Sequence, residues 1–336
     1  MILVTGGTGL VGSHLLYKLI CSNEKVKAIY RNSKKLDNVK NVFSVYTDDY
    51  ETLFNKIEWI EADLLNIPQL IEAFKNVTYV YHCAAFVSFE PNKFDVLKRT
   101  NIDGTANIVN LCLSENIEKL CHVSSIATLG NTPNNAPINE GAIWNPEDDN
   151  NVYAISKYGA EMEVWRGTQE GLNVVIVNPG VILGAGIWRY GTGNLFKKAH
   201  KGLKYYTEGT VALIDVKDVV NIMITLLKSD IKNERFVLVS ENWTYKKFLQ
   251  SLAQSVNVKP PKKVAKPWLL NIAWKLDWLK NVLTGKRRQL TKFLSRSLNS
   301  KTYYSNEKIK LILNYKFEKI DKSINDIGSI YLKKQA

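Results

Sequence analysis

The chain has 336 residues, of which 45% are hydrophobic, with four cysteines and a formal net charge of +13. This length and apolar content suffice for a full nucleotide-binding domain beside a smaller second domain. No apolar run approaches the roughly 20 residues of a membrane-spanning helix. The first residues already resemble a strand rather than a signal peptide, so we expect a cytoplasmic protein.

The positive charge raises the question of nucleic-acid binding. The lysines are spread over many segments and no nucleic-acid module is recognisable, so we expect the positive field to attract phosphorylated cofactors and acidic substrates, and we expect no nucleic-acid partner. Cys21, Cys83, Cys112 and Cys121 lie in apolar patterns without C-x-x-C spacing. This predicts reduced core residues and no metal site.

A glycine-rich string follows the first predicted strand. Met1 to Val4 is a short apolar run, the string occupies 5–12, and helical spacing extends from Ser13 to Cys21. This order brings backbone N–H groups and the positive end of a helix dipole to one point, which suits a pyrophosphate. The spacing fits a dinucleotide-binding fingerprint, and the alternative is a plain glycine turn. The predicted contacts are Thr5, Gly6, Gly9, Leu10, Val11 and Gly12.

Strands and helices then alternate along the chain. We predict strands at 26–30, 57–61, 79–83, 119–123 and 174–177, an edge strand at 236–239, and helices at 68–74, from about Tyr153, and at 216–227. Such alternation builds a parallel sheet with right-handed crossovers. The predicted fold class is α/β: a Rossmann-type doubly wound parallel sheet with a smaller C-terminal substrate lobe.

Two stretches depart from this alternation. From about Gly180 to Leu213, and from about Glu241 to the end, shorter segments carry many aromatic residues and lysines. A second domain woven from two stretches has this appearance. We therefore predict an NADP-binding domain at 1–179 and 214–240, and a substrate-binding lobe at 180–213 and 241–336.

Arg31 follows the second predicted strand, at the position that meets the adenosine ribose in a dinucleotide fold. An acidic residue there binds the 2′-hydroxyl of NAD, whereas an arginine accommodates the 2′-phosphate of NADP. Basic Lys34 and Lys35 come next, and no acid stands at the strand end. The sequence therefore favours NADP, with NAD possible; the alternative is a solvated basic turn.

Small or acidic residues follow the next two strands. Asp63 and Leu64 come after the third strand, where the Asp63 carboxylate could accept a hydrogen bond from the adenine amino group or simply cap a helix. Ala84 and Ala85 after the fourth strand are small enough for a cofactor to lie against them, although packing explains them nearly as well. All four are predicted cofactor contacts.

A tyrosine and a lysine stand four residues apart at the start of a predicted helix. This spacing places Tyr153 and Lys157 on one helical face, where the cation can lower the pKa of the phenol. Ser124 and Ser125 follow the strand at 119–123, at the edge where ligands bind in open parallel sheets. A hydroxyl donor, a phenol and a lysine are thus expected to converge.

A tryptophan-rich segment at 267–288 stands apart from these patterns. It contains Trp268, Trp274 and Trp278 among leucines and ends in Lys286, Arg287 and Arg288. We favour a helix packed over the active-site cleft. Contact with an anionic membrane surface or a partner is the alternative.

Together these motifs resemble the short-chain dehydrogenase/reductase superfamily, in particular its extended branch of epimerases, dehydratases and reductases. The resemblance covers roughly residues 1–240. Besides the glycine string, Ser125 and the Tyr153–Lys157 pair, it rests on Asp63-Leu64, His82-Cys83-Ala84-Ala85, Asn101-Ile102-Asp103-Gly104-Thr105, Asn178-Pro179-Gly180 and Asp215-Val216-Lys217-Asp218-Val219.

The resemblance implies roles for individual residues. Tyr153 would be the general acid/base, and Lys157 would lower its pKa and bond the nicotinamide ribose. Ser125, chosen over Ser124 because it stands five residues before Gly130, would polarise the substrate carbonyl. Asn101 would complete the catalytic set. The remaining implied cofactor contacts are Ser124, Tyr153, Pro179, Gly180 and Val181, of which the last three would close over the nicotinamide.

Departures from the family pattern narrow the branch. Ile126 and Ala127 stand where dehydratases carry an Asp-Glu pair, and Leu129 replaces the tyrosine usual in sugar epimerases. Arg31 and Asn178-Pro179 look more like dihydroflavonol-4-reductases and cinnamoyl-CoA reductases, with 3β-hydroxysteroid dehydrogenases close by. Aromatic residues of the lobe, Trp188, Tyr190, Tyr205 and Tyr206, fit an apolar substrate or ordinary packing.

We therefore predict an NADP-dependent oxidoreductase, monomeric or dimeric, that reduces a ketone or aldehyde or oxidises the corresponding alcohol. Two alternatives remain: an NAD-dependent sugar-nucleotide epimerase, and a non-catalytic redox sensor that binds NADP. The presence of Ser125, Tyr153 and Lys157 argues against the sensor, which needs no proton donor.

Overall fold

The computed structural model describes residues 1–133, 136–285, 288 and 290–335. Its main sheet has seven strands in the order β10-β6-β5-β4-β1-β2-β3, and every neighbouring pair is parallel. The strands are β1 (Ile2–Thr5), β2 (Val26–Tyr30), β3 (Glu58–Glu61), β4 (Tyr79–His82), β5 (Lys119–Val123), β6 (Val174–Pro179) and β10 (Glu234–Leu238). The strand order reverses between β1 and β4, and ligands bind at such a switch point.

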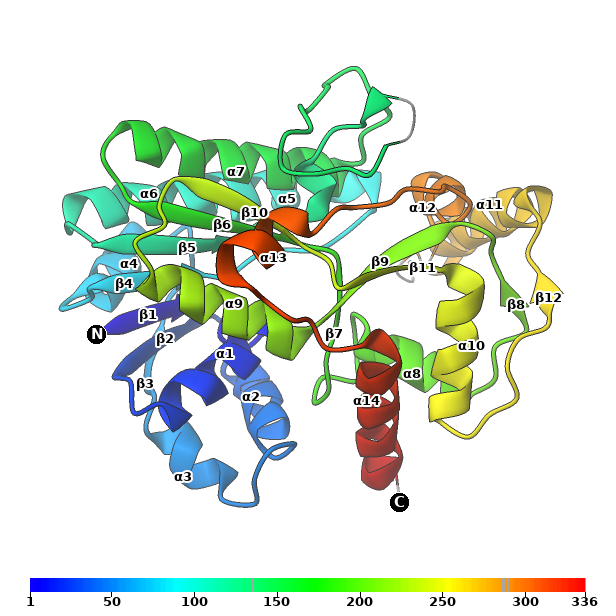
Figure 1. Ribbon diagram of the computed structural model, residues 1–336, viewed down its shortest axis with the longest axis horizontal. Coiled ribbons are helices and arrows are strands. Elements are labelled where there is room, and N and C mark those ends of the chain that lie inside the picture. Colours follow the sequence, from blue (N-terminus) through cyan, green and yellow to red (C-terminus); the bar gives the residue numbers. More distant parts are fainter. Residues whose placement is uncertain (134–135, 286–287, 289, 336) are drawn as a thin grey trace.

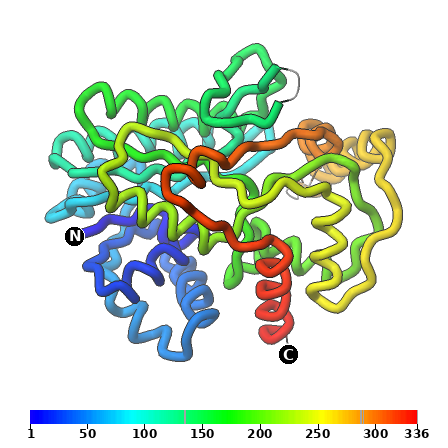
Figure 2. Tube along the Cα trace, viewed as in Figure 1, coloured from blue at the N-terminus to red at the C-terminus, as the bar shows by residue number. Residues whose placement is uncertain are grey.

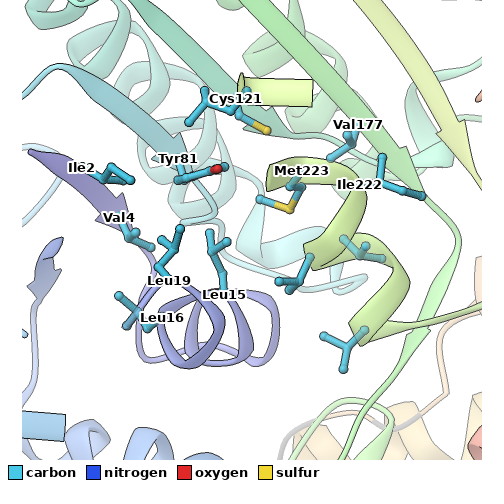
Figure 3. Close-up of a cluster of buried hydrophobic side chains, with 14 of the residues drawn as sticks. Ile2, Val4, Leu15, Leu16, Leu19, Tyr81, Cys121, Val177, Ile222 and Met223 are labelled. Atoms are coloured by element: carbon cyan, nitrogen blue, oxygen red, sulfur yellow. The ribbon is translucent and has the colours of Figure 1, made fainter. Parts of the chain in front are cut away.

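Helices cover both faces of this sheet (Figure 1). One face carries α1 (Leu10–Cys21), α2 (Leu36–Phe43), α3 (Tyr50–Asn55) and α9 (Val216–Lys228), and the other carries α4 (Ile67–Phe74), α6 (Gly104–Ser114) and α7 (Val152–Gln169). Because strand residues alternate between faces, Ile2 and Val4 join the core under α1 and α9 (Figure 3). Leu3 joins the core under α6. A sheet buried on both faces explains its continuous apolar strands.

A second, smaller unit surrounds a three-stranded sheet of order β11-β9-β7. Its elements are β7 (Val181–Leu183), α8 (Gly193–His200), β8 (Tyr205–Tyr206), β9 (Thr210–Asp215), β11 (Glu241–Thr244), α10 (Tyr245–Ser255), β12 (Lys263–Val264), α11 (Pro267–Thr284), α12 (Lys292–Ser297) and α14 (Ile320–Gln335). The chain leaves the main sheet after Pro179 and enters the small sheet at Val181. It crosses again between Leu238 and Glu241.

One part of the C-terminal stretch returns to the main domain. Helix α13 (Glu307–Leu313) packs beside β10, and its Ile309 is buried in the core shared with α1 and α9. The Asp218 carboxylate on α9 accepts hydrogen bonds from the Tyr315 hydroxyl at 2.9 Å and the Glu318 backbone N–H at 3.0 Å. Residues 307–318 thus fasten the two units together (Figure 2).

The predicted fold class is confirmed, and so are the strands at 26–30 and 119–123, residue for residue. The late strand lies at the sheet edge as predicted, next to β6. The first helix was placed too late: α1 begins at Leu10, inside the glycine string. Elsewhere the predicted ends shift by one or two residues at 57–61, 79–83, 174–177 and 236–239.

Two predictions about side-chain burial are wrong. Cys112 and Cys121 are buried, but Cys21 is exposed at the end of α1 and is not a core residue. Helix α11 forms within the segment 267–288, yet none of its fully described residues is buried, so the expected close packing over the cleft is absent. Lys286 and Arg287, which the prediction included, lie outside the described residues.

Short connections carry some further elements. Helix α5 (Phe94–Leu97) runs into a π-helical turn at Lys98–Asp103, and 3₁₀ turns occupy Ser33–Lys35, Pro91–Lys93 and Ile126–Thr128. Among the described residues, no helix combines the length and apolar character needed to cross a bilayer.

Candidate active site

The predicted site residues follow the carboxyl ends of successive strands. The glycine loop comes after β1, Arg31 after β2, Asp63 close after β3, Ala84 close after β4 and Ser125 close after β5. Because these strands are parallel neighbours, their carboxyl ends lie at one edge of the sheet. Residues separated by more than a hundred positions therefore share one side of the molecule.

The glycine loop requires glycine at two positions for different reasons. Gly6 has φ +67°, and a Cβ there would lie 2.5 Å from the backbone nitrogen of Ala84. At Gly12 a Cβ would lie 2.3 Å from the carbonyl oxygen of Gly6. The loop can turn closely past both β4 and its own helix only because these side chains are absent.

The start of α1 fits a dinucleotide pyrophosphate. Gly9 is the N-cap residue and supplies no side-chain cap, and the first turn holds no acidic residue. The backbone N–H groups of Leu10, Val11 and Gly12 therefore belong to the uncapped positive end of a 12-residue helix. The earlier start of α1 places these three predicted contacts in its first turn.

Replacing Gly12 by alanine should lower folding stability, whereas replacing Gly9 by alanine should lower mainly cofactor affinity. A Cβ at Gly12 collides with backbone and should cost about 1–3 kcal/mol of unfolding free energy, whereas a Cβ at Gly9 meets Gly6 oxygen at 3.3 Å. Gly9→Ala should therefore keep its stability and lose mainly cofactor affinity. Urea unfolding and a fluorescence titration with NADPH measure the two effects. Equal stability of the two variants would contradict this account of the loop.

Thr5 braces the strand ends beside the loop. Its Oγ1 shares a hydrogen bond of 2.7 Å with His82 Nδ1 and accepts one from the Ala84 N–H at 3.3 Å. Thr5 is fully buried, so it orders the edge where Ala84 lies partly exposed and Ala85 exposed. Thr5 is also a predicted cofactor contact. The same side chain holds the ends of β1 and β4 together.

Arg31 and Asp63, both predicted cofactor contacts, form an ion pair. Arg31 Nη1 lies 3.4 Å from Asp63 Oδ2, and the arginine side chain is 62% exposed. Asp63 Oδ1 also accepts the Leu65 N–H at 2.9 Å in a local turn, whereas Asn66, not Asp63, caps α4. Leu64 is buried, and its carbonyl accepts a hydrogen bond from Asn107. An exposed pair of this kind is weak, so Arg31 remains accessible to an anionic ligand.

Ser125 and Tyr153 are brought together from β5 and α7. Asn151 caps α7 by accepting the Ala154 N–H at 2.9 Å, which fixes Tyr153 in the first turn. Ser125 Oγ accepts the Ala127 N–H at 3.1 Å. Burial raises the pKa of Tyr153, and a hydrogen bond with Ser125 opposes that rise. The two side chains therefore lie close enough for Ser125 to influence the pKa of Tyr153.

Lys157 is buried, and its ammonium group is hydrogen-bonded at the end of β5. It is 2% exposed, and its Nζ donates to the Val123 carbonyl at 2.9 Å. Burial lowers the pKa of Lys157 to about 8. Burial raises the pKa of Tyr153 overall, and the predicted lowering of that pKa by Lys157 stays a prediction. The hydrogen bond to Val123 holds Lys157 at the end of β5.

Asn101 lies in the π-helical turn and is 1% exposed. Its Oδ1 accepts the Phe86 N–H at 2.7 Å, and its Nδ2 donates to the Phe86 carbonyl and to Ser156 Oγ, both at 3.0 Å. It thus ties the loop after β4 to α7. These contacts give Asn101 a positioning role, and its predicted place in the catalytic set stays a prediction.

Glu161 was not identified from the sequence. Its buried carboxylate connects several segments around the candidate site. It is fully buried, one helical turn beyond Lys157, and accepts hydrogen bonds from five side chains. Its Oε2 binds Ser124 at 2.5 Å, Thr128 at 2.8 Å and Asn178 at 2.9 Å, and its Oε1 binds Arg235 at 3.0 Å and Trp165 at 3.3 Å. The regular spacing 153, 157, 161 could have drawn attention to it.

The predicted contacts Pro179, Gly180 and Val181 stand where the chain changes sheets. The Gly180 N–H donates to the Leu238 carbonyl at 3.0 Å, and a Cβ at Gly180 would lie 2.7 Å from the Ala212 oxygen. Ser124, also a predicted contact, gives its hydroxyl to Glu161. This leaves Ser125 as the serine that acts on the pKa of Tyr153.

The sequence allows two interpretations of the aromatic residues in the small unit, an apolar substrate site or ordinary packing. Trp188 packs against Phe196 and Tyr331, with ring centroids 6.3 and 5.2 Å apart. Tyr190 bonds Asn38, and Tyr205 belongs to the β8–β12 pair. Trp188 therefore serves ordinary packing, and the side chains weaken the argument for an aromatic substrate.

Known proteins share both the sequence pattern and the fold. The NAD dependent epimerase/dehydratase family matches residues 2–238. A Synechocystis protein named dihydroflavonol 4-reductase is 29% identical over 278 residues, covering 81% of this chain and 77% of that protein. The crystal structure of gox2253 has a TM-score of 0.80 at 24% identity, covering 100% of this chain and 98% of its own. A Thermus thermophilus UDP-glucose 4-epimerase complex with NAD has a TM-score of 0.72 at 19% identity, covering 98% and 97%.

Proposed function

The chain belongs to the NAD-dependent epimerase/dehydratase family of NAD(P)-dependent enzymes, and on this premise we propose that it reduces a ketone or aldehyde, or oxidises the corresponding alcohol, with NADP(H). The observation that carries the proposal is the convergence of Ser125, just after β5, and Tyr153, in the first turn of α7, at the sheet edge, where Ser125 counteracts the rise in the pKa of Tyr153. That edge also bears the glycine loop and the uncapped start of α1. A proton donor thus lies on the side where a dinucleotide fits.

The residues of the chain divide the work around the reacting carbonyl. Ser125 donates a hydrogen bond to the carbonyl oxygen, and Tyr153 delivers the proton to that oxygen or removes it in the reverse direction. Lys157 supplies a buried positive charge below Tyr153, and Asn101 and Glu161 hold α7 and the β5 end in register. The bound nicotinamide supplies or accepts the hydride.

The residues that follow Ser125 argue against a dehydratase. Ile126 and Ala127 occupy the 3₁₀ turn after Ser125, so no carboxyl group stands there to assist loss of water. Leu129 is buried in a small apolar cluster with Ile138 and Ala142. We therefore propose simple hydride transfer to a carbonyl group.

A panel of aldehydes and ketones, followed through the absorbance of the reduced nicotinamide, tests this function. Stoichiometric loss of that absorbance with formation of the alcohol supports the proposal. Conversion of a sugar nucleotide without net change in absorbance would identify an epimerase instead. Tight NADPH binding with no conversion of any substrate would favour the redox sensor.

We propose NADP as the preferred cofactor because Arg31 stands after β2 with its guanidinium largely exposed. Replacing Arg31 by Ala should reduce the preference for NADP over NAD by about tenfold or more, since hydrogen bonds to a charged group contribute about 1.5–3 kcal/mol. Lys18→Ala, an exposed lysine in the last turn of α1, is the matched control and should change the preference little. Fluorescence titrations with NADPH and NADH measure it. An unchanged preference in Arg31→Ala would remove the basis for NADP.

We also propose that the two units divide the work as the sequence suggested, with 1–179 and 214–240 binding the cofactor and 180–213 and 241–336 enclosing the substrate. The strand crossings at Pro179 and between Leu238 and Glu241 support this division. Residues 307–318 pack on the cofactor side and would couple the two parts.

A further inference from the structure

Helix α11 presents large apolar side chains to solvent. The whole helix is described, and none of its residues is buried. Between 45% and 75% of the surface remains exposed on seven large apolar residues, which are Trp268, Ile272, Leu276, Trp278, Leu279, Val282 and Leu283. Exposed apolar residues are ordinary when scattered, but a contiguous group marks an interaction site.

The spacing of these residues makes them contiguous. Trp268, Ile272, Leu276, Leu279 and Leu283 follow one another at intervals of four or three, which aligns them along one side of a helix. The partly buried residues of α11, among them Leu270 and Ala273, lie on its other side, and α12 is the helix packed against it. A helix apolar on both sides is normally covered on both.

The charge around α11 indicates what covers the second side. Residues 259–300 contain eight lysines, three arginines and one acidic residue, Asp277. The Asp277 carboxylate accepts the Leu290 N–H at 3.0 Å. Lys266, Lys275, Lys280 and Lys292 are exposed on α11 or beside it. The local field is therefore strongly positive, so the missing surface is expected to be negative.

An anionic bilayer matches this combination better than a protein. Lysine is depleted from protein–protein interfaces, whereas helices lying in the membrane interface combine tryptophan and leucine with lysine and arginine. Tryptophan also favours the level of the lipid headgroups. The groove between α11 and α12 combines aromatic and basic side chains. Trp268 and Trp274 line it together with Lys292 and Arg296.

We propose that α11 anchors the protein on the surface of anionic phospholipid membranes. The apolar stripe enters the boundary between headgroups and acyl chains, and Lys275, Lys280 and Lys292 face the lipid phosphates. Arg296 on α12 pairs with Asp149 at 2.6 Å, shortly before Tyr153. The anchor is thus joined to the segment that leads into α7, so docking holds the substrate-binding side of the molecule near the membrane.

Flotation of the full-length protein with lipid vesicles tests the anchor without relying on activity. The wild type should float with phosphatidylcholine vesicles that contain phosphatidylglycerol, bind pure phosphatidylcholine more weakly, and dissociate further in high salt. Leu276→Glu/Leu283→Glu should reduce the partition coefficient about tenfold or more, because two buried leucines are lost. The matched control is Leu311→Glu on α13, where a leucine 80% exposed lies away from α11.

Several outcomes would overturn the anchor. One is failure of the wild type to float with the anionic vesicles, and another is equal flotation of the wild type and the α11 variant. A third is a wild-type dimer in light scattering that the variant dissociates while neither binds vesicles, since the stripe would then be a protein interface. NADPH binding by the variant checks that its fold is intact, as expected for substitutions at exposed positions.

Discussion

Phenylalanine in place of Tyr153 is expected to lower kcat about 10²- to 10⁴-fold while leaving cofactor binding unchanged. The substitution removes only the hydroxyl, whose pKa burial raises and Ser125 lowers. The ring remains, and so does its edge-to-face contact with Phe89, at a centroid distance of 5.4 Å. A carbonyl-reduction assay measures kcat, and a fluorescence titration with NADPH measures cofactor binding.

Tyr158→Phe is the matched control for this prediction. Tyr158 lies on the same helix, and its ring stacks on Trp144 at 4.5 Å. Loss of its hydroxyl should leave kcat close to that of the wild type. Near-normal turnover in Tyr153→Phe would mean that another group donates the proton, and an equal loss in both variants would indicate a structural effect on α7.

Alanine in place of Glu161 is expected to lower the free energy of unfolding by about 3–5 kcal/mol. The carboxylate is fully buried and pairs with Arg235 at 3.0 Å. Its removal leaves a largely buried guanidinium without its counter-charge, and leaves Ser124 and Asn178 without an acceptor on this carboxylate. Urea unfolding, followed by circular dichroism, measures the loss.

Glu163→Ala is the matched control on the same helix. Glu163 pairs with Arg166 at 2.9 Å on the partly exposed side of α7, and such a pair contributes about 0–1 kcal/mol. Glu161→Gln should lie between the two variants because it keeps one acceptor oxygen. If Glu161→Ala and Glu163→Ala prove equally stable, the buried network does not support the site.

The cofactor half of the site was accessible from the sequence because it depends on local order. A strand, a glycine turn and a helix follow one another within 21 residues, and each leaves its own pattern of apolar spacing and glycine placement. The parallel sheet was predictable for the same reason, since alternating strands and helices allow few topologies. The start of α1 was misplaced because glycine disfavours helix interiors, whereas here Gly12 is needed for close packing against Gly6.

Contacts between distant segments could not be predicted in this way. The carboxylate of Glu161 binds side chains from the loop after β5 and from β6, α7 and β10, and no local pattern records which donors will surround a buried acid. The return of Ile309 and Tyr315 to the main domain is similarly invisible in a segment that otherwise belongs to the small unit.

The sequence by itself therefore determined the α/β fold and the family, because spacing along the chain fixes which side chains share a strand end or a helical face. The same spacing predicts Ser125, Tyr153 and Lys157 as a catalytic set, and that set stays a prediction. Only the tertiary structure decided that Lys157 is held by Val123, that burial raises the pKa of Tyr153, and that one side of α11 stays uncovered. Desolvation and burial depend on what packs around a residue, and that surrounding comes from parts of the chain far away in sequence.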